Sequence, residues 1–222
     1  MNTTRIWDLP TRLFHWLLAL SIVGLIITGN VGGNAMTWHF RLGYLVLSLL
    51  IFRLIWGVVG GYWSRFIRFI YSPMHTVRYV LGQHAPSDDV GHSPTGALSV
   101  FAILGVVLAQ VLSGLVSDDE IATTGPWIAW VSSETSSMAT QYHTEIGKLI
   151  LLGLIVLHVL ALIVYRIKGK RDLVPAMVSG NKRLSTHVPR SRDDVVSRLA
   201  GLLVMALSGA MTYVLVSVLP AA

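Results

Sequence analysis

Four histidines stand inside long apolar stretches of this chain: His15, His39, His143 and His158. An ionisable side chain at membrane depth is costly, so it usually has a partner or a chemical role. Each stretch has roughly the 20 residues that a helix needs to cross a bilayer. Five such segments can be recognised, at about 13–30, 40–60, 96–116, 143–165 and 199–219, and His39 directly precedes the second. We therefore expect an all-α integral membrane protein in contact with the lipid bilayer.

The composition supports a membrane protein and excludes several other classes. Hydrophobic residues make up 53% of the 222 residues and charged residues only 13%, about half the charged fraction of a soluble domain. Cysteine is absent, which excludes disulfides and thiolate-bound iron–sulfur clusters. The net charge of +6 does not indicate nucleic acid as a partner, because the basic residues flank the apolar segments on one side instead of forming one patch.

The charges of the connecting segments predict the topology. Residues 61–95 and 166–198 carry twelve Lys or Arg, whereas 117–142 carries none and has four carboxylates, Asp118, Asp119, Glu120 and Glu134. The turn 31–38 has no charge. Because basic loops stay in the cytoplasm, we expect a multi-pass protein of the bacterial inner membrane with its N-terminus in the cytoplasm and its C-terminus in the periplasm.

Two connections contain further local signals. Pro73, Pro86 and Pro94 interrupt the first basic connection, which predicts a short interfacial helix near 64–81 followed by coil. Trp127 and Trp130 lie in the acidic connection, and their amphipathic rings suit the headgroup level of the membrane.

The four histidines pair by depth on this topology. His15 lies near the cytoplasmic end of the first segment, and His39 near the outer end of the second. His143 opens the fourth segment from outside. His158 follows 15 residues later, which is about 22 Å along a helix. Its side chain points within about 60° of the direction of the His143 side chain around the helix axis. We therefore expect an inner pair, His15 with His158, and an outer pair, His39 with His143.

Two imidazoles at each level suit a non-covalent haem b, since two axial ligands leave no open position and favour simple electron transfer. Gly43 and Gly147 each follow a ligand by four residues, and a glycine one turn away leaves room for a flat macrocycle. The alternative is that each histidine only hydrogen-bonds a neighbouring helix and each glycine only packs. Four histidines at matched depths favour two haems.

Charged residues near the inner pair have two open interpretations. Arg12 and Arg53 could pair with a haem propionate or could anchor their helices at the interface. Arg41 and Lys148 are similar candidates on the outer side. The remaining histidines lie among Gly, Pro, Ser and charged residues and are expected to be solvated; these are His75, His84, His92 and His187.

At these residues the chain resembles the bacterial cytochrome b561 family, especially the b-type cytochrome subunits of nickel–iron hydrogenases. The resemblance covers roughly residues 5–168 and is carried by PTRLFHWLLA, WHFRLGYLVLSLLIFRLIWGVVGGYWSRF and YHTEIGKLILLGLIVLHVLAL. It implies a four-helix transmembrane bundle with two b haems and with axial ligands at the four histidines named above. It also implies electron exchange between the membrane quinone pool and a redox partner.

These observations predict three parts: a di-haem core at 1–168, a basic cytoplasmic connection at 169–198, and a fifth transmembrane helix with an outer tail at 199–222. The leading hypothesis is an electron conduit between quinone and a periplasmic c-type cytochrome or hydrogenase-like enzyme. A second is a superoxide:quinone oxidoreductase, although the acidic outer connection is unfavourable for an anionic substrate. A third is a structural subunit without cofactor.

Overall fold

A computed structural model describes residues 2–83, 85–119, 123–167 and 173–219. His84, Glu120 and three basic residues of the second basic connection, Lys168, Lys170 and Arg171, lie outside the described residues. Among the described residues, five helices are long and apolar enough to cross a membrane, which confirms the five segments expected from hydropathy. Leu20, Leu149 and Leu202 are each well over half exposed on these helices, as lipid-facing side chains should be.

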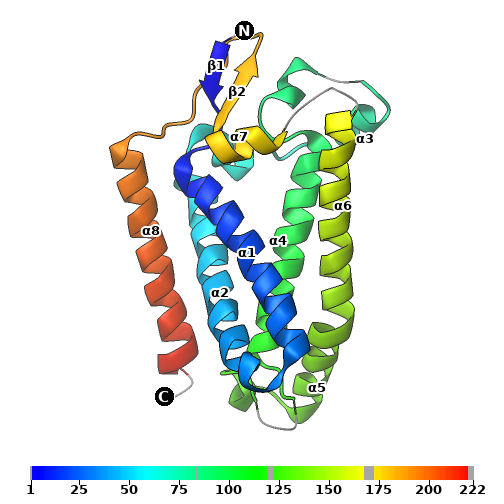
Figure 1. Cartoon of the computed structure of the whole chain (residues 1–222), viewed down its shortest axis with the longest axis vertical. Coiled ribbons are helices and arrows are strands. Elements are labelled where there is room, and N and C mark those ends of the chain that lie inside the picture. Colours follow the sequence, from blue (N-terminus) through cyan, green and yellow to red (C-terminus); the bar gives the residue numbers. More distant parts are fainter. Residues whose placement is uncertain (1, 84, 120–122, 168–172, 220–222) are drawn as a thin grey trace. The chain divides into compact units, whose positions relative to one another are not determined.

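The long helices are α1 (Leu9–Val31), α2 (Met36–Val59), α4 (Pro94–Leu115), α6 (Gly147–Ile167) and α8 (Val195–Tyr213) (Figure 1). A one-turn π-helix at Tyr142–Ile146 joins α5 (Ser133–Gln141) to α6, and another at Val214–Val218 continues α8. The fourth segment is therefore longer than expected: an apolar helical run extends over Ser133–Ile167. His143 lies inside that run, in the π turn, and does not begin it.

The chain divides into two compact units, and each long helix contributes residues to both. The first unit comprises 1–15, 53–102 and 156–204, and the second comprises 16–52, 103–155 and 205–222. The first contains His15, His158 and both basic connections, apart from its share of the long helices. The second contains His39, His143 and the acidic connection.

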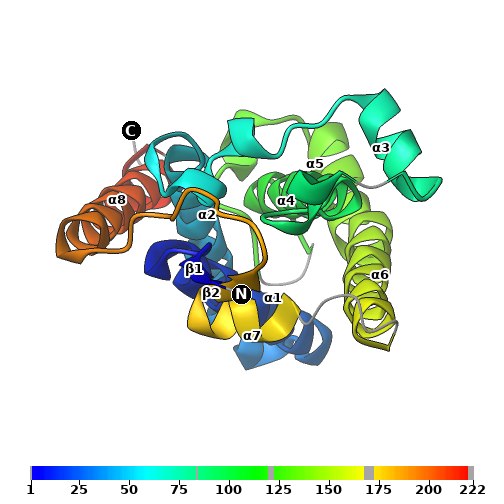
Figure 2. The same ribbon diagram turned by 90° about the horizontal axis from the view of Figure 1, so that it is seen from above.

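The first unit contains structure that hydropathy did not predict. Strand β1 (Asn2–Arg5) pairs antiparallel with β2 (Asn181–Leu184), with Asn2 opposite Leu184. Helix α7 (Leu173–Ser179) lies beside the two strands (Figure 2). Ile6, Trp7, Ala176 and Leu184 form a small buried apolar cluster there. The second basic connection is therefore partly folded onto the N-terminus. The division of the chain into three parts at 168 and 198 stays a prediction.

The expected interfacial helix is shorter than the sequence indicated. Helix α3 covers only Pro73–Val80, with Ser72 accepting a hydrogen bond from the backbone N–H of His75 at its N-terminus. Two single 3₁₀ turns, Tyr62–Ser64 and Phe66–Arg68, precede it.

Helix α8 packs on the rest of the chain within both units. In the second unit, Ser48 on α2 donates a hydrogen bond to Thr212 over 2.9 Å, and the Trp127 indole N–H donates to the carbonyl of Leu215 over 2.8 Å. In the first unit, the backbone of Gly201 lies against Pro10 and Trp56. These contacts hold α8 against other helices of the same chain.

Candidate functional site

The outer histidine pair is brought together within the second unit. The rings of His39 on α2 and His143 in the π turn have centroids 6.0 Å apart and planes at 82°. Metal–imidazole bonds are about 2 Å long and a ring nitrogen lies about 1 Å from its centroid, so two imidazoles flanking one metal have centroids about 6 Å apart. The spacing therefore fits one metal atom between the rings.

Both outer histidines are fixed through the same ring atom. His143 donates Nδ1–H to the carbonyl of Gln110 on α4 over 2.8 Å, and His39 donates Nδ1–H to the carbonyl of Leu25 on α1 over 3.1 Å. A carbonyl can only accept, so Nδ1 carries the proton and Nε2 keeps its lone pair. A histidine that binds a metal through one nitrogen usually donates from the other to such a partner.

A repeated sequence element holds each of these rings. Thr28–Gly29 on α1 and Ser113–Gly114 on α4 follow the accepting carbonyl by three and four residues. Each hydroxyl lies 3.3 Å from the nearby Nδ1. An added Cβ would lie 3.1 Å from the His39 ring at Gly29 and 2.9 Å from the His143 ring at Gly114. Glycine at these two positions therefore lets each imidazole approach the neighbouring helix closely.

The same two rings border a cavity of about 250 Å³ within the second unit. Its wall is largely apolar, as the walls of cofactor sites usually are. Gly29 and Gly114, the glycines of the two repeated elements, both line it. Lys148 and Asp119 also line it, so one cation and one carboxylate lie at its boundary. Arg41 is not among the lining residues, and its guanidinium stacks over Trp38 at 5.0 Å.

The two glycines singled out from the sequence differ in their surroundings. Gly43 lines the cavity, and no atom lies within 4 Å of the position where its Cβ would be. Open space beside Gly43 is what the expected macrocycle requires. Gly147 instead packs closely, because a Cβ there would collide with Gln110 and Tyr142. The expected clearance at Gly147 is therefore wrong, and the glycine allows α4 and α6 to approach.

The inner pair lies within the first unit. His15 on α1 and His158 on α6 are both half-buried and near enough to interact electrostatically. Arg53 on α2 is buried in the same unit, with 3% of its surface exposed. Its Nη1 donates to the carbonyl of Ser64 over 3.0 Å, and its guanidinium lies 4.4 Å above the Phe66 ring. Arg53 is therefore held by the protein in the unit that contains the inner pair.

A buried carboxylate, Asp8, organises this end of α1 and α2. Its Oδ1 accepts from the Thr11 N–H at 2.8 Å and the Trp56 indole at 3.1 Å. Its Oδ2 accepts from Gly61 N–H at 3.2 Å and the Ser64 hydroxyl at 2.6 Å. Asp8 caps α1 and has no exposed surface. Sequence reasoning missed this network, although an Asp directly before an apolar helix with Pro10 in its first turn is a capping signal.

Arg12 makes contacts unlike those of Arg53. Its Nη1 donates to the carbonyl of Val178 at the end of α7 over 2.6 Å, and its Nη2 lies 3.9 Å from Asp193. These contacts tie α1 to the second basic connection. They favour the anchoring interpretation, and we leave Arg12 out of the proposed cofactor site.

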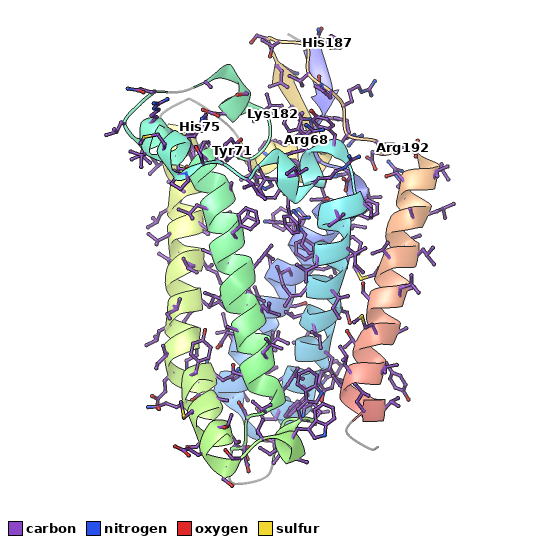
Figure 3. All side chains as sticks on the ribbon, turned by 180° about the vertical axis from the view of Figure 1, so that it is seen from behind. Arg68, Tyr71, His75, Lys182, His187 and Arg192 are labelled. Atoms are coloured by element: carbon purple, nitrogen blue, oxygen red, sulfur yellow. The ribbon has the colours of Figure 1, made fainter. Side chains whose placement is uncertain are left out.

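The expectation of solvated histidines is right for His187, which is exposed (Figure 3). His75 is partly exposed, but its ring stacks on Tyr71 at 5.2 Å and its Nε2 is 2.9 Å from Asp88. The expectation is wrong for His92, which packs against Trp7 at 4.6 Å and Phe69 at 4.4 Å, measured between ring centroids. Burial first, then the positive charge of Arg53, lowers the pKa of His92 to about 3.

The described residues contain no cluster of three or more His, Cys, Asp or Glu side chains able to hold a metal ion. The four histidines of the apolar helices instead fall into two pairs, which suits a metal whose other ligands belong to a macrocycle. Apolar helices carrying such pairs define a membrane cytochrome of the b type.

The chain belongs to the prokaryotic cytochrome b561 family, whose model matches residues 6–180. It is 26% identical over 209 residues to a probable Ni/Fe-hydrogenase B-type cytochrome subunit of Azotobacter vinelandii, covering 79% of this chain and 86% of the relative. It is also 26% identical over 214 residues to the protein of that name from Cupriavidus necator, and the match covers 81% of this chain and 87% of that relative. No solved structure gives a significant match. The chain is thus a multi-pass bacterial membrane cytochrome that binds haem b in electron transport.

Proposed function

We propose that the chain holds two haem b groups, one between His39 and His143 and one between His15 and His158, and transfers electrons between the quinone pool and a periplasmic redox partner. The observation that carries this proposal is the outer pair: two half-buried imidazoles at metal-bridging distance, each with Nδ1 bound to a carbonyl. The haem supplies one-electron chemistry when bound, and the chain fixes its ligands.

The inner pair is supported by electrostatic proximity and by Arg53, a buried cation in the same unit. A buried guanidinium is suited to a carboxylate such as a haem propionate. The first unit also contains the basic connections, and the second contains the acidic one. This distribution supports a cytoplasmic level for His15 and His158 and a periplasmic level for His39 and His143.

The partner class follows from the relatives, which are named as hydrogenase cytochrome subunits. We infer a hydrogenase-like or c-type redox protein at the periplasmic face. The experiment is stopped-flow spectroscopy on the purified protein in liposomes, with a quinol analogue added as reductant and then a ferric c-type cytochrome as acceptor. Quinol-driven haem reduction followed by partner-driven oxidation supports the proposal, and a haem spectrum that does not change with quinol contradicts it.

The superoxide hypothesis keeps one supporting observation, Lys148 at the boundary of the outer cavity. Asp119 lines the same cavity and opposes the approach of an anion. Generating superoxide enzymatically in the same liposomes separates the two functions. Haem reduction that superoxide dismutase abolishes would favour the oxidase, whereas reduction only by quinol would favour the conduit.

A further inference from the structure

His92 is a half-buried side chain with a buried ring nitrogen that is unused. It lies just before α4, and its ring is enclosed by Trp7 and Phe69. The Tyr71 hydroxyl donates to the backbone carbonyl of His92 over 2.8 Å and so fixes this residue in place. Its Nδ1 is buried and has no hydrogen-bond partner among the described residues. A buried polar atom without a partner is costly and indicates a missing one.

The charged surroundings of His92 indicate the kind of partner. The groups that act on it electrostatically include two cations, Arg53 and Lys182. Lys182 donates to the carbonyl of Val90 over 3.2 Å, so it is already bound to the chain. A buried region where basic groups converge is suited to an anion.

Arg53 and His92 meet at one ring. The His92 ring packs on Phe69, and the Arg53 guanidinium lies 6.0 Å from the centroid of the same Phe69. Asp8 is the carboxylate that acts on Arg53, but four protein donors already surround its two oxygens. Arg53 has five N–H donors, and one of its nitrogens is bound to Ser64.

We propose that His92 and Arg53 together bind a carboxylate, and that this carboxylate is a propionate of the haem held by His15 and His158. The inference rests on the proposed inner haem and adds a residue outside the helices that carry its ligands. His92 acts as a positioning residue, since its N–H would hold the propionate and does not touch the metal. Phe69 and Trp7 restrict the direction of that N–H by packing against the ring.

The test compares three variants of the full-length protein by redox titration followed spectroscopically. His92→Phe keeps an aromatic ring between Trp7 and Phe69 but removes the donor. His92→Asn restores an amide N–H close to the position of Nδ1. His187→Phe is the matched control, because His187 is an exposed histidine in the same unit.

We expect His92→Phe to make the inner haem harder to reduce, since the propionate charge is then less compensated. The oxidised-to-reduced ratio at fixed potential should rise about tenfold, which is about 59 mV for a one-electron couple. His92→Asn should restore at least half of this shift, and the outer haem and His187→Phe should not change. Loss of the inner haem from His92→Phe with retention in His92→Asn also supports the proposal.

The proposal would be overturned by an inner-haem potential unchanged in His92→Phe, by an equal shift of both haems, or by loss of the inner haem from both His92 variants. A changed quinol KM at unchanged potential would likewise overturn it, because His92 would then serve a quinone. Wild-type protein with fewer than two haems would refute the proposed function itself, whereas two haems with an unmoved potential refute only the role of His92.

Discussion

His143 donates Nδ1–H to the backbone carbonyl of Gln110, on a different helix, over 2.8 Å. This bond orients the ring so that Nε2 is the atom left for a metal. Because the acceptor is main chain, no substitution at Gln110 removes it directly. A substitution can instead change how closely the His143 ring approaches α4. That approach depends on Gly114, which lies against the ring.

Gly114→Ala should weaken haem binding at the outer site. Its Cβ would lie 2.9 Å from the His143 ring, which forces the imidazole away from Gln110. Changes to the groups that orient a metal ligand typically cost about 10–100-fold in affinity. Gly209→Ala on α8 is the control, because nothing lies within 4 Å of its Cβ. Haem content after detergent dilution measures the effect, and equal retention by both variants would contradict this role for Gly114.

Asp8→Asn should destabilise the protein by about 3 kcal/mol, since the amide cannot accept from all four donors and leaves buried N–H groups unmatched. The apparent Tm should fall by about 6–12 °C for a chain of this size. The exposed Glu134 provides the control as Glu134→Gln. Thermal unfolding in detergent is the measurement. A variant that unfolds at the wild-type temperature would show that the network around Asp8 does not stabilise the fold.

Asp193 ties the N-terminus to the start of α8. It accepts from the Leu9 N–H at 3.1 Å and lies 3.4 Å from Arg5 and 3.2 Å from Arg198. Burial alone raises the pKa of Asp193, but the bonds from Arg198 and Leu9 outweigh it and hold the pKa below its ordinary value.

A lowered folded-state pKa means that Asp193 stabilises the protein above its unfolded pKa of about 4 and loses this effect as the pH falls through the folded value. Asp193→Asn should therefore cost about 1–2 kcal/mol at pH 7. The difference from wild type should shrink as the pH is lowered below about 4. Thermal unfolding of wild type and Asp193→Asn at several pH values tests this prediction. A stability difference that grows as the pH falls would contradict it.

The topology can be tested directly because the chain has no cysteine. Ser133→Cys in the acidic connection should react with a membrane-impermeant maleimide in intact spheroplasts. Ser185→Cys, beyond β2, should react only after the membrane is opened. Both serines are exposed, so a difference in labelling reports the side of the membrane. Labelling of Ser185→Cys in intact spheroplasts would reverse the predicted orientation.

Hydropathy was enough to predict the five long helices, because membrane spans need only length and apolarity. The pairing of His39 with His143 could be inferred from depth, since both flank outer connections. The strand pair β1–β2 could not be inferred, because it joins residues separated by most of the chain and its strands have four residues each. Such short segments carry no clear periodicity.

The remaining errors have a common cause, which is that burial and contact depend on neighbouring helices. His92 lies among Gly, Ser and Pro, a loop composition, yet Trp7 and Phe69 enclose it. Gly147 was chosen from spacing along its own helix, whereas the glycine against the His143 ring is Gly114, on α4. The repeated Thr–Gly and Ser–Gly pairs at 28–29 and 113–114 were a signal that could have been found.

The haem-to-protein ratio, with reduced-minus-oxidised spectra, tests the central claim most directly when measured on wild type, His143→Ala and His158→Ala. Two bis-histidine sites predict about two haems in wild type and about one in each variant, with different bands retained. Wild type with one haem or none, or variants that keep the full haem content, would contradict the two histidine pairs.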